Sequence, residues 1–281
     1  MSVAVFDPRP CQLGEGAMWH PGRQQAFWFD ILGKRLLSRK GDQALEWQFN
    51  EHVSAAGWLD DDHLLIASET ALFRFDLRDG TRHPIAALEA GISANRSNDG
   101  RADPMGGFWI GTMAKDARQG AGAIYRWFRG ELRQLRANVS IPNAICFSPD
   151  ATLAYFADTA EQTVWRQALD AEGWPVGTPQ VFLDLRAQGL FPDGAITDAQ
   201  GRFWNAQWGA GRLACYGADG AMQQVVDLPS AQTTCPAFIG PALDTLLITS
   251  AATGLSGTQE GLSWQITLPG VTGSPVPKVL L

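Results

Sequence analysis

Carboxylate, amide and guanidinium side chains gather in four short segments of the chain, each leading into an apolar run. The segments are LGEGAMW with Glu15, NRSNDG with Arg96, Asn98 and Asp99, SIPNAICF with Asn143, and LFPDGAITD with Asp193. Carboxylate and amide oxygens are hard ligands, so Glu, Asn and Asp together suit Ca²⁺, Mg²⁺ or Mn²⁺. These residue types therefore favour a cation site, provided that the segments converge in space.

Each segment also has a simpler explanation as a turn. Pro-Asn and Pro-Asp-Gly, the settings of Asn143 and Asp193, are ordinary turn sequences. Asp99 is expected to hold the Gly-rich turn that precedes the apolar run 108–110. Glu15 resists this explanation, because a lone carboxylate between glycines neither caps a helix nor pairs with a local cation. The set as a whole therefore favours a site more than any single segment does.

Histidine and cysteine do not support a zinc centre of the usual kind. The four histidines are expected on the surface, in turns or at strand edges: His20, His52, His63 and His83. The four cysteines are scattered without a CxxC or Cys/His spacing, which argues against a zinc knuckle or a disulfide framework. Carboxylates can still bind zinc, so that ion stays among the candidates.

The elements that must position these segments follow a repeat. Apolar runs recur about every 44 residues, a period typical of propeller blades and not expected of a β-sandwich or jelly roll. Their centres are Trp28, Ile66, Trp109, Phe156, Trp204 and Ile248. Each run follows a strand and a hairpin turn and precedes further β-like pieces, which gives about four strands per unit.

We therefore predict an all-β, six-bladed propeller that forms a single domain over residues 1–281. The segment AVFDPR is expected to supply a strand to the last blade. A ring of blades leaves a central channel, and the innermost strands point their first residues into it. The four polar segments lie just before these strands, so they are expected to converge on the channel from different blades.

Composition excludes several classes of function. The net charge of −7 argues against a nucleic-acid partner, which requires a basic face. The N-terminal residues have neither a basic start nor a long apolar run, so we expect no signal peptide, no membrane span and a cytoplasmic location. A small neutral substrate or a cation is compatible with the charge.

The ordered motifs resemble the gluconolactonase family, also called the senescence marker protein or regucalcin family. The similarity runs from LGEGAMW to ATGLSGTQEG, which is nearly the full length. It includes RSNDGRADPMGGFWIGTM, IPNAICFSPDATLAYFADT, FPDGAITDAQGRFWNAQWGAGRLACY and TTCPAFIGPALDTLLITSA. The family fold is a six-bladed propeller, in agreement with the repeat. The C-terminal block departs from the family pattern, because it is shortened after GLS.

The resemblance implies roles for individual residues. Glu15, Asn143 and Asp193 stand where family members hold one divalent metal ion, which leaves Ca, Mg, Mn, Fe and Zn as candidates. Arg96 and Asn98 stand where the substrate is contacted. Asp116 matches an acidic substrate contact that is often Glu, in a loop that varies within the family.

These roles predict hydrolysis of a sugar acid lactone to the open aldonic acid. The metal would polarise the lactone carbonyl, and Asp193 would accept a proton from the attacking water. A phosphotriester hydrolase on the same propeller and a non-enzymatic calcium-binding propeller are the alternatives. A condensation of the strictosidine-synthase kind fits least, because the motifs belong to the lactonase branch. Glucono-, xylono-, arabinono- and galactono-lactones all remain open as substrates, and we expect a monomer.

Overall fold

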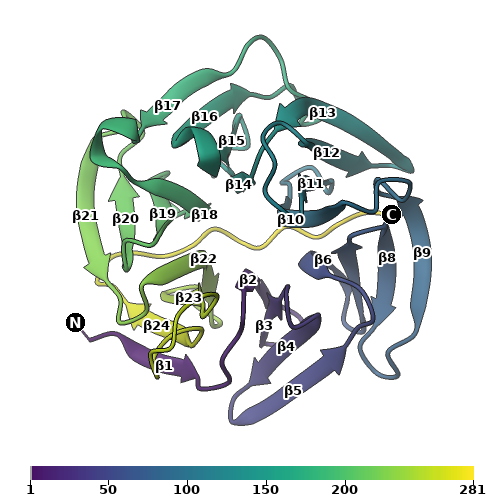
Figure 1. The fold of residues 1–281 in the computed structure, drawn as a ribbon, viewed down its shortest axis with the longest axis horizontal. Coiled ribbons are helices and arrows are strands. Elements are labelled where there is room, and N and C mark those ends of the chain that lie inside the picture. Colours follow the sequence, from purple (N-terminus) through teal and green to yellow (C-terminus); the bar gives the residue numbers. More distant parts are fainter. Residues whose placement is uncertain (1) are drawn as a thin grey trace.

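The structure is a computed structural model that describes residues 2–281, and these residues form six four-stranded sheets arranged as a ring (Figure 1). In every sheet the neighbouring strands run antiparallel. The prediction of an all-β, six-bladed propeller with four strands per blade is confirmed. Helical structure in the described residues is confined to two short 3-10 turns, η1 (Thr159–Glu161) and η2 (Arg186–Gln188).

The first three blades follow one another along the chain. Blade 1 contains β2 (Gly14–His20), β3 (Gln25–Asp30), β4 (Arg35–Lys40) and β5 (Gln43–Gln48). Blade 2 contains β6 (Val53–Asp60), β7 (His63–Ser68), β8 (Ala71–Asp76) and β9 (Arg82–Ala87). Blade 3 contains β10 (Asn95–Ala102), β11 (Phe108–Ala114), β12 (Gly122–Phe128) and β13 (Glu131–Val139).

The remaining blades complete the ring. Blade 4 contains β14 (Pro142–Phe147), β15 (Leu153–Asp158), β16 (Thr163–Ala168) and β17 (Gln180–Asp184). Blade 5 contains β18 (Phe191–Thr197), β19 (Phe203–Trp208), β20 (Arg212–Tyr216) and β21 (Met222–Asp227). Blade 6 contains β22 (Gln232–Ile239), β23 (Thr245–Ala251), β24 (Ser263–Thr267) and β1 (Ala4–Asp7).

The ring closes through the N-terminal strand. β1 pairs with β24, so residues from the two ends of the chain share blade 6 and the predicted role of AVFDPR is confirmed. This pairing gives the last blade its fourth strand and joins distant parts of the chain. Closure of the ring leaves only short outer edges, which is how propellers protect their sheets from pairing with other chains.

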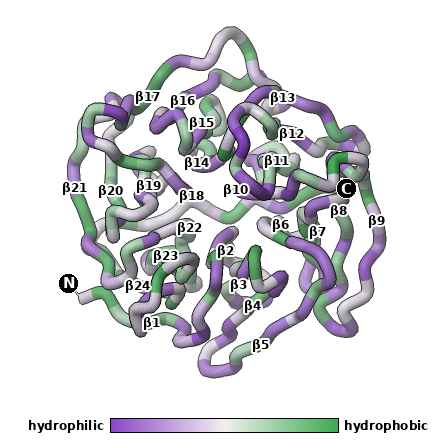
Figure 2. The backbone as a smooth tube through the Cα atoms, viewed as in Figure 1, coloured by the Kyte–Doolittle hydropathy of each residue, from purple (hydrophilic) through white to green (hydrophobic). Residues whose placement is uncertain are grey.

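The hydrophobic core lies between blades rather than within one centre. Phe27 and Phe29 of blade 1 pack with Leu64 and Ile66 of blade 2, and similar buried clusters occur between the other neighbouring pairs of blades. Hydrophobic and hydrophilic stretches alternate along the blades in Figure 2. Burial of these apolar faces on both sides of each sheet holds the blades in a closed ring around the channel.

The chain after β24 crosses one face of the ring (Figure 1, yellow). Its backbone hydrogen-bonds to Leu243 of blade 6 at 2.7 Å, to Trp58 of blade 2 at 3.0 Å and to Gly106 of blade 3 at 2.8 Å. Val279 in this segment is buried against blades 2 and 3. We call residues 271–281 the C-terminal strap. No helix among residues 2–281 has the length and apolar character needed to cross a membrane.

Candidate functional site

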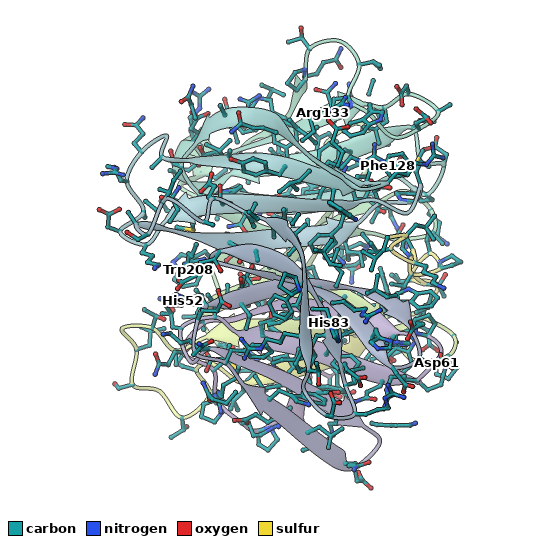
Figure 3. The ribbon with its side chains drawn as sticks, turned by 90° about the vertical axis from the view of Figure 1, so that its right-hand side faces the viewer. His52, Asp61, His83, Phe128, Arg133 and Trp208 are labelled. Atoms are coloured by element: carbon teal, nitrogen blue, oxygen red, sulfur yellow. The ribbon has the colours of Figure 1, made fainter. Side chains whose placement is uncertain are left out.

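A cavity of about 420 Å³ opens at one end of the channel and collects the polar segments. Its polar lining consists of Glu15, Arg96, Asn98, Asn143, Thr159 and Asp193. Its apolar lining includes Leu13, Met113, Ile141, Phe191 and Trp208. Trp208 and His52 lie toward one face of the ring in the edge-on view of Figure 3, whereas Asp61 and Phe128 lie toward the other. The predicted convergence from four blades is therefore observed.

The polar residues occupy the innermost strands themselves, which corrects the expectation that they lie in turns before those strands. Glu15 is in β2, Asn98 in β10, Asn143 in β14 and Asp193 in β18. Within residues 2–281, each innermost strand changes register against its neighbour at this level. Such β-bulges re-aim side chains, and here they turn polar groups toward the channel.

Gly16 explains why the bulge in β2 requires a glycine after Glu15. Its φ of 58° lies in the left-handed region, and a Cβ at this position would collide with the carbonyl oxygen of Ser54 in β6. Glycine alone meets both conditions without strain. The glycine that follows Glu15 therefore lets blade 1 approach blade 2 closely while Glu15 turns into the cavity.

The two carboxyl groups of the site come from distant parts of the sequence, β2 and β18. Glu15 and Asp193 are both buried, and both line this cavity. Burial, followed by the nearby charge of Asp99, raises the pKa of Glu15 to about 8. Burial and the charge of Glu15 likewise raise the pKa of Asp193 well above its ordinary value. Two carboxylates cannot both be charged here without a compensating cation.

Amide and hydroxyl groups form a hydrogen-bonded chain beside the carboxyl pair. Asn98 Nδ2 donates to Asn143 Oδ1 at 3.2 Å and to the Pro142 carbonyl at 2.9 Å. Asn143 Nδ2 donates to Thr159 Oγ1 at 2.8 Å, and Thr159 donates to the carbonyl of Pro192 at 2.7 Å. The chain links blades 3, 4 and 5 and fixes the orientation of the Asn143 amide.

Arg96 is the cation of the cavity. Its Nη1 donates to Asn98 Oδ1 at 2.7 Å and to the Ser97 carbonyl at 2.9 Å. Burial lowers the pKa of Arg96 to about 10, which still leaves it charged near neutral pH. Within the described residues only Nη1 forms hydrogen bonds, so the other N–H groups of Arg96 are available to a ligand in the cavity.

Asp99 does not hold a turn, contrary to expectation. It is buried in β10, and its Oδ2 accepts a hydrogen bond from the backbone N–H of Ile145 at 2.7 Å. It therefore ties blade 3 to blade 4. Its Oδ1 is buried and makes no hydrogen bond within residues 2–281.

Asp116 is the predicted site residue that the structure does not bring into the cavity lining. It lies in the exposed turn between β11 and β12, where its Oδ1 accepts from the backbone N–H of Arg118 at 3.2 Å. The turn begins after Ala114, whose neighbour Met113 does line the cavity. A contact between Asp116 and substrate stays a prediction.

The expectation of surface histidines is wrong for one of the four. His20 is fully buried at the end of β2, where its Nε2 lies 2.9 Å from the carbonyl oxygen of Asp60 and its ring packs against Trp58. The packing of blade 1 on blade 2 buries it. His52 and His63 are half-buried, and His83 is exposed.

Two further residues contribute to the site without being marked by the sequence. Thr159, in η1, orients the Asn143 amide, and Trp208, in β19, forms part of the cavity wall beside Phe191. Within residues 2–281, no three His, Cys, Asp or Glu side chains form a metal-holding group. A metal ion in this cavity would therefore rely on two carboxylates and an amide oxygen.

Comparison with known proteins gives consistent matches. The family described as SMP-30/Gluconolactonase/LRE-like region matches residues 13–252. An L-arabinolactonase of Azospirillum brasilense is 35% identical over 253 residues, covering 87% of this chain and 82% of its own. A 6-deoxy-6-sulfogluconolactonase of Pseudomonas putida is 32% identical over 263 residues, covering 92% and 90%. The crystal structure of a calcium-binding protein, regucalcin, from Agrobacterium tumefaciens superposes with a TM-score of 0.96 at 39% identity, covering 100% of this chain and 98% of the other.

Proposed function

The chain belongs to the SMP-30/gluconolactonase/LRE-like family, and we propose that it hydrolyses the ester bond of a sugar lactone with one divalent metal ion in its channel. The similar proteins named for hydrolysis of arabinolactone and of sulfogluconolactone support an aldonolactone as the substrate class. The product is the open aldonic acid, so the protein is a carboxylic-ester hydrolase.

The observation that carries the metal requirement is the carboxyl pair. Glu15 and Asp193 are both buried in the wall of the same cavity, and the pKa of each is raised. Arg96 alone does not offset two buried negative charges, and its N–H groups are directed in part at Asn98. A divalent cation between the carboxylates would stabilise their charged forms, so the residues present fit such an ion.

Glu15, Asn143 and Asp193 are the residues that would hold the ion through oxygen atoms. Ca²⁺, Mg²⁺, Mn²⁺, Fe²⁺ and Zn²⁺ all accept such ligands, and the carboxylates favour the harder ions of this group. A divalent ion in this position supplies Lewis acidity toward the lactone carbonyl. The Thr159 hydroxyl keeps the Asn143 amide in the orientation that presents its oxygen.

Asp193 is the candidate general base. Its carboxylate accepts the proton of the attacking water, and the burial that raises its pKa strengthens it as a base. Cleavage of the ester bond releases the ring oxygen as the hydroxyl group of the aldonic acid. The proton taken by Asp193 is then available for that oxygen.

The remaining cavity residues bind the sugar. Free N–H groups of Arg96 donate to substrate hydroxyl or carbonyl oxygens, and the second lone pair of Asn98 Oδ1 accepts from a substrate hydroxyl. Phe191 and Trp208 are opposite one another in neighbouring strands of blade 5, and neither is fully buried in the cavity wall. Their rings provide an apolar surface for the C–H face of the sugar.

Three finer expectations belong to the same proposal. Asp116 contacts a substrate hydroxyl from the β11–β12 turn. The protein acts as a monomer in the cytoplasm. Its partner is a small lactone, and the acidic net charge of −7 speaks against a nucleic acid.

A hydrolysis assay with a pH indicator tests the proposal. Metal-stripped protein is given each of the five ions in turn with glucono-, xylono-, arabinono- and galactono-lactone. The Asp193→Asn variant serves as the blank, because lactones also hydrolyse spontaneously. Metal-dependent turnover above this blank is the expected result and identifies both the ion and the sugar.

A calcium-binding propeller without turnover is the second candidate, because the similar crystal structure is that of a calcium-binding protein. It predicts that Ca²⁺ binds while no lactone is consumed above the blank. It also predicts that Arg96→Ala leaves Ca²⁺ binding unchanged. If the wild type turns over lactone and Arg96→Ala loses that turnover, this candidate is contradicted.

A further inference from the structure

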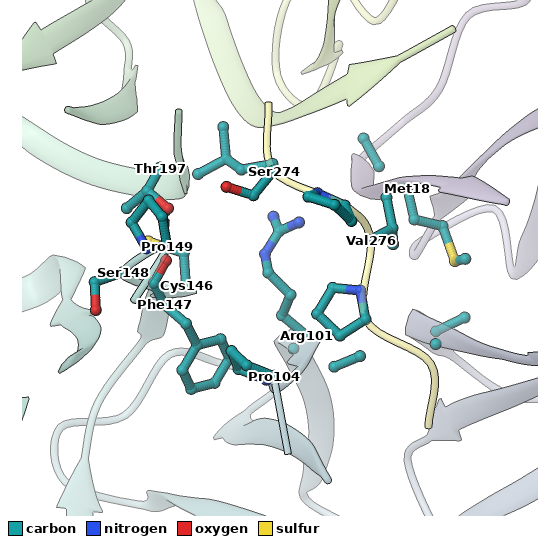
Figure 4. A pocket seen from close by; sticks show the side chains of 18 of the residues that line it. Met18, Arg101, Pro104, Cys146, Phe147, Ser148, Pro149, Thr197, Ser274 and Val276 are labelled. Atoms are coloured by element: carbon teal, nitrogen blue, oxygen red, sulfur yellow. Dashed lines mark hydrogen bonds between the residues drawn. The ribbon is translucent and has the colours of Figure 1, made fainter. Parts of the chain in front are cut away.

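A second cavity of about 180 Å³ lies at the opposite end of the channel, beneath the C-terminal strap. Ser274 and Val276 of the strap line it together with Cys146, Thr197 and Arg101. Figure 4 shows the Arg101 side chain extending into the middle of this space. Arg101 therefore occupies the channel on the side away from Glu15 and Asp193.

The Arg101 guanidinium joins three blades in addition to its own. From β10, its Nε donates to the carbonyl of Ile145 in β14 at 3.0 Å. Its Nη2 donates to the carbonyl of Ala195 in β18 at 3.1 Å and lies 3.5 Å from that of Pro236 in β22. The planar, forked guanidinium can satisfy several carbonyls at fixed angles, which a lysine ammonium cannot reproduce.

The carbonyls that Arg101 holds are close to the candidate metal ligands. Ile145 follows Asn143 within the bulge of β14, and Ala195 follows Asp193 within the bulge of β18. Because β14 and β18 belong to different sheets, no ladder of backbone hydrogen bonds sets the distance between them. Side chains must set it instead.

Other side chains also connect blades 4 and 5, but they reach fewer blades. Thr159 donates to the carbonyl of Pro192, and Thr197 donates to that of Phe147 at 2.5 Å. Each links blade 4 with blade 5 only. Arg101 alone among these residues connects both strands to blade 3 and approaches blade 6.

We propose that Arg101 is a positioning residue, which holds β14 and β18 at the separation that lets Asn143 and Asp193 share one divalent ion. This inference rests on the proposed function, because it takes the metal ligands from there. Arg101 lines the cavity under the strap and not the one that contains Arg96, so it has no contact with the lactone.

The sign of the effect separates positioning from electrostatics. The positive charge of Arg101 repels a cation in the same channel. If Arg101 acted only through this charge, its replacement by Met would tighten metal binding. Removing a positioning effect weakens metal binding, because the ion must then bring the two strands together itself. Loss of groups that orient ligands typically weakens metal binding by about 10- to 100-fold.

The test is titration of the metal-stripped protein, residues 1–281, with Mn²⁺, in which calorimetry measures the binding. Arg101→Met removes the hydrogen bonds and the charge, and Arg101→Lys keeps the charge. Arg202→Met is the matched control, because Arg202 is also half-buried but pairs with Asp198 in the β18–β19 turn of blade 5 at 2.6 Å. Circular dichroism and the Tm of each variant report on folding.

We expect Arg101→Met to bind Mn²⁺ about 10- to 100-fold more weakly than wild type. The affinity of Arg101→Lys should lie between these two. Arg202→Met should bind Mn²⁺ within about twofold of wild type. At saturating Mn²⁺ the KM for the lactone should stay within about twofold in both Arg101 variants. If Arg101→Met does not fold, the Arg101→Lys result decides alone.

Equal or tighter Mn²⁺ binding by the Arg101 variants overturns the inference and leaves the proposed function intact. A loss of Mn²⁺ affinity in Arg202→Met as large as that in Arg101→Met also overturns the inference. A wild-type protein that binds neither Mn²⁺ nor Ca²⁺ overturns the metal requirement of the proposed function, and the role of Arg101 with it.

Discussion

The metal-free protein should lose stability as the pH rises, because Glu15 is buried as a protonated acid. Its ordinary pKa of 4.5 is raised to about 8 by burial and by the nearby charge of Asp99. Between these two values the folded protein keeps a proton that the unfolded chain has released. The free energy of unfolding therefore falls by about 1.4 kcal/mol per pH unit for this one group.

Between about pH 5 and about pH 8 the loss amounts to about 4 kcal/mol, which is large against the usual stability of a folded domain. The stabilising protonated form is fully present below pH 4.5 and is lost as the pH rises through about 8. A bound divalent ion should remove this dependence, because it stabilises the charged carboxylate instead.

Equilibrium unfolding in urea measures the effect across this pH range, with a chelator or with Mn²⁺ present. Glu15→Gln is the matched control, since its amide stays neutral at every pH while the groups outside the carboxyl pair titrate as in wild type. The difference between wild type and Glu15→Gln should decline with rising pH only when metal is absent. A difference that stays flat or rises in the chelator would refute the account of the carboxyl pair.

Three further predictions concern the cavity wall and its hydrogen bonds. Arg96→Ala should raise the KM for the lactone more than it lowers kcat, in steady-state kinetics, because Arg96 binds sugar oxygens before and during the reaction alike; a lower kcat at unchanged KM would contradict this. Thr159→Val removes two buried hydrogen bonds and should lower the free energy of unfolding in urea by about 2–4 kcal/mol. Thr163→Val removes a single partly buried hydrogen bond and should lower this free energy by less. Trp208→Ala should raise the lactone KM several-fold while calorimetry shows Mn²⁺ binding unchanged; a weaker metal affinity would place Trp208 in the metal site instead.

The blades can be predicted because their signal repeats along the chain. Runs around Trp28, Trp109 and Trp204 form the second strand of their blades, which is buried on both faces and therefore strongly apolar. Closure by the N-terminal strand follows from the missing fourth strand of the last blade. Each of these features depends on local sequence and on a count of units.

The exact setting of the polar residues cannot be predicted in the same way. A bulge such as that after Glu15 depends on register against the neighbouring strand, and the segment NRSNDG resembles a turn because Asn, Asp and Gly favour turns. The burial of His20 arises from Trp58 on the next blade. Local sequence does not encode such partners.

The roles of Thr159 and Arg101 escape sequence analysis for a related reason. Both act through backbone carbonyls of other blades, and any residue type can supply a carbonyl. No pattern in the sequence marks these acceptors. Glu15, Asn143 and Asp193, in contrast, can be picked out because their side chains have the chemistry that a cation requires.

The most direct test of the central claim is lactone hydrolysis measured while Mn²⁺ is added stepwise to the metal-stripped protein. We predict that the rate rises and reaches its plateau at about one ion per chain, because Glu15 and Asp193 form one pair of buried carboxylates to hold it. The Asp193→Asn protein should stay at the spontaneous rate throughout. An undiminished wild-type rate in excess chelator would contradict a metal-dependent mechanism. A rate in Asp193→Asn equal to that of wild type would contradict the role of Asp193.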